Sequence, residues 1–315
     1  MIPFLARRLG QGIVVLLLVS AVTFAIMMSA PGGPSLLADP KLSAAERTAI
    51  EQQLGVDQPP MVQYARWLGR AVRGDFGSSF LYQTPSLTTI RSRLPQTLLL
   101  AGAALLISIV VGIPLGLLTA ARAGSVLDRV VTVVCGIALA VPAFWSGLML
   151  LLVFAVWAHL LPAGGAVTEG GDVGLIDRAK HLLLPAVVLA AGGCAELVRY
   201  TRSAAMTTLA LPFVQTARAR GLSPRRILWR HTLRHALTMV VSVIGLQLPR
   251  LVGGAAITET VFSWPGMGRL GVEAALGRDY PLVMAVTMVV AAGVVIAGIT
   301  ADVVQMAIDP RVRAA

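Results

Sequence analysis

Long apolar runs separated by short polar segments dominate the chain. Four stretches contain no Asp, Glu, Lys or Arg, at residues 9–38, 94–121, 130–168 and 280–301. An α-helix needs about 20 apolar residues to cross the roughly 30 Å hydrocarbon core of a bilayer. Each stretch is therefore long enough to span a membrane.

Two further apolar runs extend this pattern, although Glu196 interrupts the first and Arg250 the second. With them, the sequence predicts an all-α polytopic membrane protein with six transmembrane helices, at residues 9–28, 96–121, 130–157, 182–198, 237–258 and 282–306. The first is longer than the about 7–15 residues of a signal-peptide core, so we expect it to be retained. Composition agrees, because 56% of the 315 residues are hydrophobic and 13% are charged. These values exclude an ordinary soluble domain.

The distribution of basic residues predicts the orientation of these helices. The formal net charge is +11, and more than half of the 26 Lys and Arg residues fall in segments 1–8, 122–129, 199–236 and 309–315. Basic loops remain on the cytoplasmic side of a membrane. The sequence thus predicts a multi-pass membrane protein with both termini in the cytoplasm. The partner that the charge indicates is then the lipid bilayer, and not nucleic acid.

Three parts are expected along the chain. They are residues 1–30 with the first helix, an extracytoplasmic cap segment at residues 31–95, and a membrane core with the other five helices at residues 96–315. The cap segment is too long for a simple connection. A capping-box pattern, Ser43 to Glu46, predicts one short helix up to residue 54, and a second is expected over residues 61–73.

Two polar segments of the core are longer than plain connections. The cytoplasmic loop at residues 199–236 divides into two helical pieces at a turn over residues 221–224. Its length, and the apolar residues beside the turn, favour a docking surface over a loop that merely lies on lipid. On the outer side, segment 259–281 has a Pro-Gly turn before a helix predicted over residues 267–276.

The chain lacks the motifs of common nucleotide and catalytic sites. No GxxxxGK[ST], HExxH or GxSxG pattern occurs in the sequence. We therefore expect no catalytic residue, no metal site and no cofactor bound by this chain. If the protein moves a solute uphill, the energy must come from a partner or from an ion gradient.

A family resemblance is evident in the cytoplasmic loop. Its segment FVQTARARGL, residues 213–222, resembles the EAA-type loop through which permeases of ABC importers contact their ATPases, in the form typical of the peptide and nickel permease family. We call residues 199–236 the coupling loop. The resemblance implies that an ATPase docks on Phe213, Val214, Gln215, Thr216, Ala217, Arg218, Gly221 and Leu222.

Matching segments occur along nearly the whole chain. LGVDQP at residues 54–59 and GDFGSS at 74–79 are similar to the outer segment of the family's first permease subunit, and ETVFSWPGMG at 259–268, RDYP at 278–281 and DPRVR at 309–313 resemble its closing signatures. The resemblance implies a type I ABC importer permease fold, in a bacterial cytoplasmic (inner) membrane. It further implies an ATP-driven importer of peptides, in which this chain forms half of the translocation path. It also implies three kinds of partner: a second homologous permease subunit, two ATPase subunits that bind ATP and Mg, and an extracytoplasmic solute-binding protein.

Four residues are candidates for the translocation path or its gate. Arg250 either faces the path and attracts the carboxylate end of a peptide, or reaches the outer interface or a structural partner. Glu259 either serves at an outer gate or faces water at a helix end. For Asp302 we favour a packing contact between helices. Phe262, in the outer signature, completes the set.

Two local contacts are expected as well. Glu196 and Arg199 lie three residues apart on one helix, a spacing at which they can pair. Residues 112–114 in the second predicted span and residues 253–254 in the fifth are candidates for close helix packing or a kink at the seam between subunits.

The sequence leaves the solute and the energy source open. Similar permeases handle peptides, nickel complexes and glutathione-like molecules, and the solute-binding protein largely sets the choice. A proton- or sodium-driven secondary transporter would need intramembrane carboxylates, for which Glu196, Glu259 and Asp302 are available. A membrane scaffold without a transport path is the remaining alternative.

Overall fold

The regular structure of the chain is helical. The computed structural model describes residues 2–30, 33, 45, 58–168, 170 and 174–308. Within these ranges the regular elements are helices, apart from an isolated bridge between Ser78 and Pro85. The expected first cap helix, from Ser43, and the segments 54–57 and 309–313 lie outside the described residues, except Ala45.

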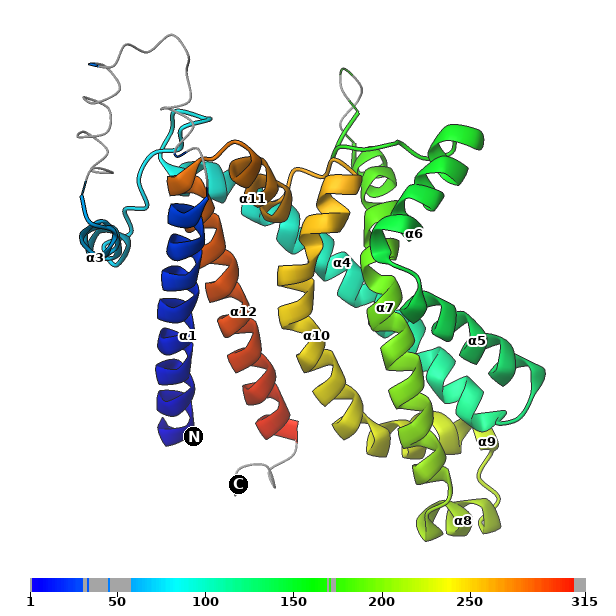
Figure 1. Cartoon of the computed structure of the whole chain (residues 1–315). Coiled ribbons are helices and arrows are strands. Elements are labelled where there is room, and N and C mark those ends of the chain that lie inside the picture. Colours follow the sequence, from blue (N-terminus) through cyan, green and yellow to red (C-terminus); the bar gives the residue numbers. More distant parts are fainter. Residues whose placement is uncertain are drawn as a thin grey trace. The chain divides into compact units, whose positions relative to one another are not determined.

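The long helices match the predicted spans in position, and most extend beyond them (Figure 1). Four of the described helices are long and apolar enough to cross a membrane, and the number rises to six if each of two bent helix pairs counts as one span. The helices are α1 (Ile2–Ser29), α3 (Pro60–Ala71), α4 (Ser86–Ala121), α5 (Val126–Ala140), α6 (Ala143–Leu150), a π-helical continuation (Leu151–Trp157), α7 (Leu175–Leu209), α8 (Pro212–Ala219), α9 (Pro224–Arg226), a π-helical segment (Ile227–Thr232), α10 (Leu233–Val261), α11 (Met267–Leu276) and α12 (Tyr280–Ile308).

The third predicted span is not one straight helix. Its two halves, Val126–Ala140 and Ala143–Trp157, are bent by 107° at a short break. Val141 is extended there, with φ −83° and ψ 128°, and Pro142 precedes the first residue of α6. A proline disfavours helical geometry in the residue before it and lacks the N–H that a continuous helix needs. Pro142 therefore accounts for the break.

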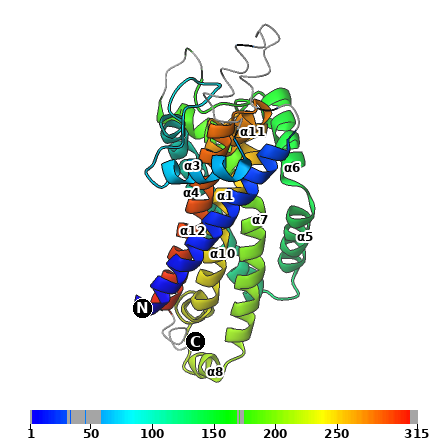
Figure 2. The same cartoon turned by 60° about the vertical axis from the view of Figure 1, so that its left-hand side comes forward.

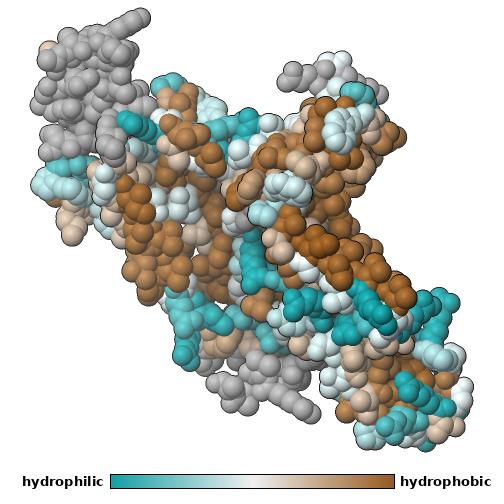
Figure 3. All heavy atoms as spheres, turned by 45° about the vertical axis from the view of Figure 1, so that its right-hand side comes forward, coloured by the Kyte–Doolittle hydropathy of each residue, from teal (hydrophilic) through white to brown (hydrophobic). Residues whose placement is uncertain are grey.

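Much of the surface is apolar, as lipid contact requires. Large aliphatic side chains are exposed along the long helices, among them Ile13, Val110, Leu246 and Ile296. Figure 3 shows extended brown, apolar areas on the face that it presents. Patches of this extent on a soluble protein would mark a binding surface. On helices long enough to span a bilayer, they are the surface that faces lipid or neighbouring subunits.

Contacts divide the chain into two units. One contains residues 98–264 and the described part of 294–315, and the other contains residues 2–97 and 265–293. In the second unit an aromatic cluster joins α1 and α3: the Phe24 and Tyr64 ring centroids lie 5.4 Å apart, and those of Tyr64 and Trp67 lie 6.1 Å apart. The Ser20 and Tyr64 hydroxyls are hydrogen bonded at 2.8 Å. The second expected cap helix thus exists as α3 and packs on α1.

Segments of this second unit that are far apart in the sequence meet at one buried carboxylate. Asp279 is fully buried, and its Oδ2 accepts hydrogen bonds from the Ser79 hydroxyl and from the Leu81 N–H. The helix predicted at residues 267–276 is α11, where the Tyr82 hydroxyl donates to Glu273 at 3.0 Å. Partial burial and the nearby carboxylate of Glu273 raise the pKa of Tyr82. Asp279 therefore holds segment 79–81 to the start of α12.

In the first unit, α4 and α7 approach closely at two glycines. A Cβ on Gly112 would lie 2.8 Å from the Leu197 Cβ, and one on Gly116 would lie 2.6 Å from the Thr201 Cβ. Glycines four residues apart allow such backbone approach between membrane helices. The close packing expected at Gly112 is therefore present, but it lies within this chain and not at a seam between subunits.

Candidate functional site

The first part of the coupling loop, residues 199–209, continues α7, which ends at Leu209. Leu211 is extended and Pro212 opens α8, a helix of eight residues. A proline at the first position suits a helix start, because its missing N–H would have no partner there in any case. In Figures 1 and 2, α8 lies at the end of α7 that is farther from α6.

The inner face of α8 holds the loop together. Val214 and Ala217, three residues apart, are buried against Ile227, with Leu209 and Leu222 packed around them. Residues three and four apart share one face of a helix. Of the residues expected to dock an ATPase, Val214 and Ala217 are thus covered within this chain, and Leu222 is half-buried.

The outer face of α8 is available for a partner. Phe213 is 42% exposed, although its ring lies 5.6 Å from the ring of His235. The other exposed residues of the predicted docking set are Gln215, Thr216, Arg218 and Gly221. The surface offered by α8 is therefore one aromatic ring among polar and cationic groups.

The turn after α8 depends on Gly221. This residue has φ +77°, and its N–H donates to the Arg218 carbonyl at 2.9 Å. The Leu222 N–H donates to the Ala217 carbonyl at 3.2 Å. These bonds satisfy carbonyls at the end of α8, and the positive φ is the conformation that glycine adopts without a steric penalty. The turn predicted over residues 221–224 is confirmed.

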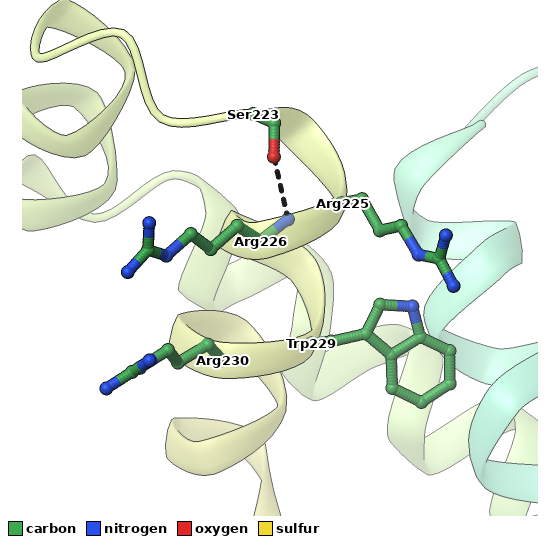
Figure 4. Close-up of a pocket in the computed structure, with 5 residues that line it drawn as sticks. All are labelled: Ser223, Arg225, Arg226, Trp229 and Arg230. Atoms are coloured by element: carbon green, nitrogen blue, oxygen red, sulfur yellow. Dashed lines mark hydrogen bonds between the residues drawn. The ribbon is translucent and has the colours of Figure 1, made fainter.

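A cationic cavity of about 450 Å³ adjoins this turn, lined by Ser223, Arg225, Arg226, Trp229 and Arg230. The Ser223 hydroxyl accepts a hydrogen bond from the Arg226 N–H at 3.4 Å. Figure 4 shows Arg225 and Trp229 pointing to one side of the turn, and Arg226 and Arg230 pointing to the other. The residues that line this cavity include three guanidinium groups, and this positive charge favours an anionic partner.

A second open cavity, of about 490 Å³, lies between α8 and the start of α10. It is lined by Phe213, Arg230, His231, Arg234 and His235. Phe213 supplies the apolar part, and two arginines supply charge. The two cavities share Arg230, so the basic surface is continuous from α8 to α10.

An ion pair between Arg202 and Asp128 fixes the C-terminal part of α7 near this surface. Arg202 donates through Nε and Nη2 to the two carboxylate oxygens of Asp128, at 2.7 and 2.8 Å. The same carboxylate accepts the Gly124 N–H at 2.9 Å. A two-point guanidinium–carboxylate contact fixes orientation as well as distance. The α4–α5 turn is therefore tied to α7, seven residues before the end of that helix.

The path candidates fall into different environments. Glu259 is fully buried, so it does not face water at a helix end, and Phe262 is buried in an apolar cluster with Leu184 and Val188. Asp302 is half-buried in α12. The ion pair that Arg250 forms is with Glu196, which is not one of the other three candidates.

Arg250 pairs with Glu196 across the α7–α10 contact. Its Nη1 lies 2.8 Å from Oε1 and 3.1 Å from Oε2 of Glu196. The pairing of Glu196 with Arg199 expected from their spacing is thus wrong, because α10 brings a second cation to the carboxylate from 54 residues away. The sequence carries no signal for a contact of this separation beyond the presence of one ionisable residue in each span.

No group of three or more His, Cys, Asp or Glu side chains in the described ranges is arranged to hold a metal ion.

Comparison with known proteins places the chain in a transport family. A family model described as "Binding-protein-dependent transport system inner membrane component" matches residues 112–314, and its N-terminal companion matches residues 1–101. The oligopeptide transport system permease protein AppB of Bacillus subtilis is 41% identical over 99% of this chain and 100% of that protein. The dipeptide transport system permease protein DppB of Escherichia coli K12 is 33% identical over 99% of both.

A solved structure supports the fold. The MetNI methionine ABC transporter, described as inward facing, matches 70% of this chain and 97% of its own chain with a TM-score of 0.57. The sequence identity is 20%, so this likeness concerns the fold alone.

Proposed function

The chain belongs to the family of binding-protein-dependent transport system inner membrane components, and from this membership we propose that it forms half of a peptide path driven by partner ATPases. Relatives named as oligopeptide and dipeptide permeases, aligned over almost their full length, support peptides as the solute class. The chain is a multi-pass membrane permease and not an enzyme by itself. ATP and Mg are held by the partner subunits.

The observation that carries the proposal is the surface of the coupling loop. Phe213 lines one cavity with Arg230 and Arg234. Arg226 points to the same side of the turn as Arg230 (Figure 4). Such a surface complements an acidic groove with an apolar pocket, and complementary charge speeds association and fixes register. The ATPase pair would push on α8 when ATP closes it, and the spans would rock between outward-open and inward-open states.

The remaining partners follow from the same proposal. A second homologous permease subunit would complete the path, and a solute-binding protein would deliver peptide on the outer side. Both termini would lie in the cytoplasm with the coupling loop. Of the path candidates, we propose that Arg250 lines the path, that Glu259 and Phe262 shape its outer gate from within the helix packing, and that Asp302 joins helices.

The whole importer in proteoliposomes tests this function. Both permeases, the ATPases and the binding protein are reconstituted with ATP in the lumen, and uptake of a labelled tripeptide is measured. We expect uptake that requires ATP and persists with a proton or sodium ionophore, and this chain alone should hydrolyse no ATP. Uptake that survives without ATP and collapses with the ionophore would instead indicate a secondary transporter, and uptake of a nickel complex but no peptide would refute the solute class.

A further inference from the structure

The Arg250–Glu196 ion pair lies far from both ends of its helices. Arg250 stands about 25 Å along α10 from Leu233, at about 1.5 Å per residue, and α10 continues to Val261 beyond a 55° bend between Leu251 and Ala255. Glu196 is about 20 Å from the end of α7 at Leu209. The pair is therefore at membrane depth, where charged groups belong in a bundle interior or a water-filled cavity.

The pair nevertheless faces outward from this chain. The Arg250 side chain is 69% exposed and that of Glu196 is 29% exposed. Leu246, four residues before Arg250 on α10, is exposed on the same side, and Ile257 is exposed beyond the 55° bend between Leu251 and Ala255. A charged pair at this depth would be costly against lipid, so the surface must face water or a polar partner at this point.

The helices that carry the pair are fixed directly beside it. Gln247, one turn before Arg250, is buried and donates through Nε2 to the Gly193 carbonyl at 2.8 Å. A Cβ on Gly193 would lie 2.8 Å from the Gln247 Oε1, so a larger residue there would displace the Gln247 amide. Because α7 and α10 run in opposite directions (Figure 1), Glu196 and Arg250 lie one turn to either side of this contact, and their long side chains meet across it. Their backbones are thus held by a buried contact while their charged ends remain outside.

The ends of the pair have spare hydrogen-bonding capacity. Within the described residues, Arg250 contacts Glu196 through Nη1, which leaves the Nε and Nη2 groups open on an exposed guanidinium. A guanidinium presents five N–H donors in a fork that fits a carboxylate. The Glu196 carboxylate can accept from an ammonium group. An exposed ion pair contributes little net stability, so a solute can compete for either partner.

We propose that the Arg250–Glu196 pair is a binding element for the charged ends of a peptide, the guanidinium taking the terminal carboxylate and Glu196 taking the terminal ammonium. The inference rests on the proposed function and names the kind of solute that the path recognises, which is a zwitterion. Its carboxylate replaces Glu196 as the partner of Arg250, and its ammonium group replaces Arg250 as the partner of Glu196. Without solute, the pair neutralises itself and keeps an unpaired charge out of the path.

Uptake by the whole importer tests the assignment. We compare a free tripeptide with its N-acetylated and C-amidated forms in the wild type, Arg250→Gln, Glu196→Gln and the exchanged pair Arg250→Glu with Glu196→Arg. Each variant is first shown to copurify with its partner subunits. Arg250→Gln should lower free-peptide uptake about tenfold and reduce the preference over the amidated form, and Glu196→Gln should reduce the preference over the acetylated form. The binding protein is common to all variants, so its own preference cancels in these ratios.

A structural pair would behave differently. With a purely structural pair, the single variants would lower uptake of all three peptides equally, and the exchanged pair would recover wild-type uptake. Either result would overturn the inference, and so would unchanged ratios of uptake between the free peptide and its blocked forms. If the wild type imports no peptide with ATP, the proposed function itself fails, which is a distinct result.

Chemical access gives a readout independent of the binding protein. In a cysteine-free chain within the whole importer, Arg250→Cys should react with a water-soluble, sulfonate-bearing thiol reagent, and Gln247→Cys, buried one turn away, should not. Protection of Arg250→Cys from the reagent in every nucleotide state would mean that a partner subunit or lipid covers the position, and would overturn the inference.

Discussion

Replacing Gly221 by valine is expected to lower ATP-driven uptake about tenfold, whereas asparagine at the same position should preserve most of it. Gly221 has φ +77°, and a Cβ there would meet no atom within 4 Å, so backbone conformation alone distinguishes the two substitutions. A β-branched residue is strongly disfavoured at this φ, and asparagine tolerates it better than other side chains. A penalty of about 1–2 kcal/mol changes a conformational ratio by about 5–30-fold.

The physical reason is the position of α8. The Gly221 and Leu222 N–H groups close the end of α8 onto the Arg218 and Ala217 carbonyls. Valine would release this turn and move the docking face, while the membrane helices stay intact. Uptake is measured together with the amount of this chain in the membrane, and the two variants are compared at equal amounts. Equal uptake by the valine and asparagine variants would show that the turn does not transmit force.

Replacing Gly116 by leucine is expected to have the largest effect on stability. A Cβ there would lie 2.6 Å from the Thr201 Cβ and 2.8 Å from the Val198 carbonyl oxygen. Because one obstacle is backbone, α4 and α7 must separate. Overpacking of this kind costs about 1–3 kcal/mol and occasionally more. The purified importer should therefore lose several degrees of thermal stability.

Gly102 provides the matched control for this prediction. It lies on the same helix, and a Cβ there would meet nothing within 4 Å. Gly102→Leu should leave thermal stability near that of the wild type. Similar melting temperatures for the two leucine variants would contradict the close packing of α4 and α7.

Helix positions were predictable from sequence because they depend on local composition. Apolar runs of sufficient length and basic loops between them placed the spans, and the Pro-Gly turn placed α11. The break at Pro142 depends on how the chain bends afterwards, and the predicted straight span did not anticipate it. The three-part division at residues 30 and 95 stays a prediction.

The candidate site was predictable in part. The turn at Gly221 followed from small residues, and the inward direction of Val214 and Ala217 could have been read from their spacing of three within a short helix. The pairing of Arg250 with Glu196 could not, because it arises from the packing of α7 on α10 and competes with a local partner, Arg199. The packing of α7 on α10 thus makes Arg250, and not Arg199, the partner of Glu196.

The central claim is that α8 lies in the cytoplasm against an ATPase, and site-specific cross-linking tests it most directly. In the importer lacking Cys135 and Cys194, a bifunctional thiol–amine reagent is applied to Gln215→Cys on the exposed face of α8, with Leu81→Cys in the outer segment as the control. We predict a cross-linked adduct between Gln215→Cys and an ATPase subunit. We also predict that an impermeant reagent added outside intact cells labels Leu81→Cys and not Gln215→Cys. Labelling of Gln215→Cys from outside, or an importer that is active without any ATPase adduct at this position, would contradict the account.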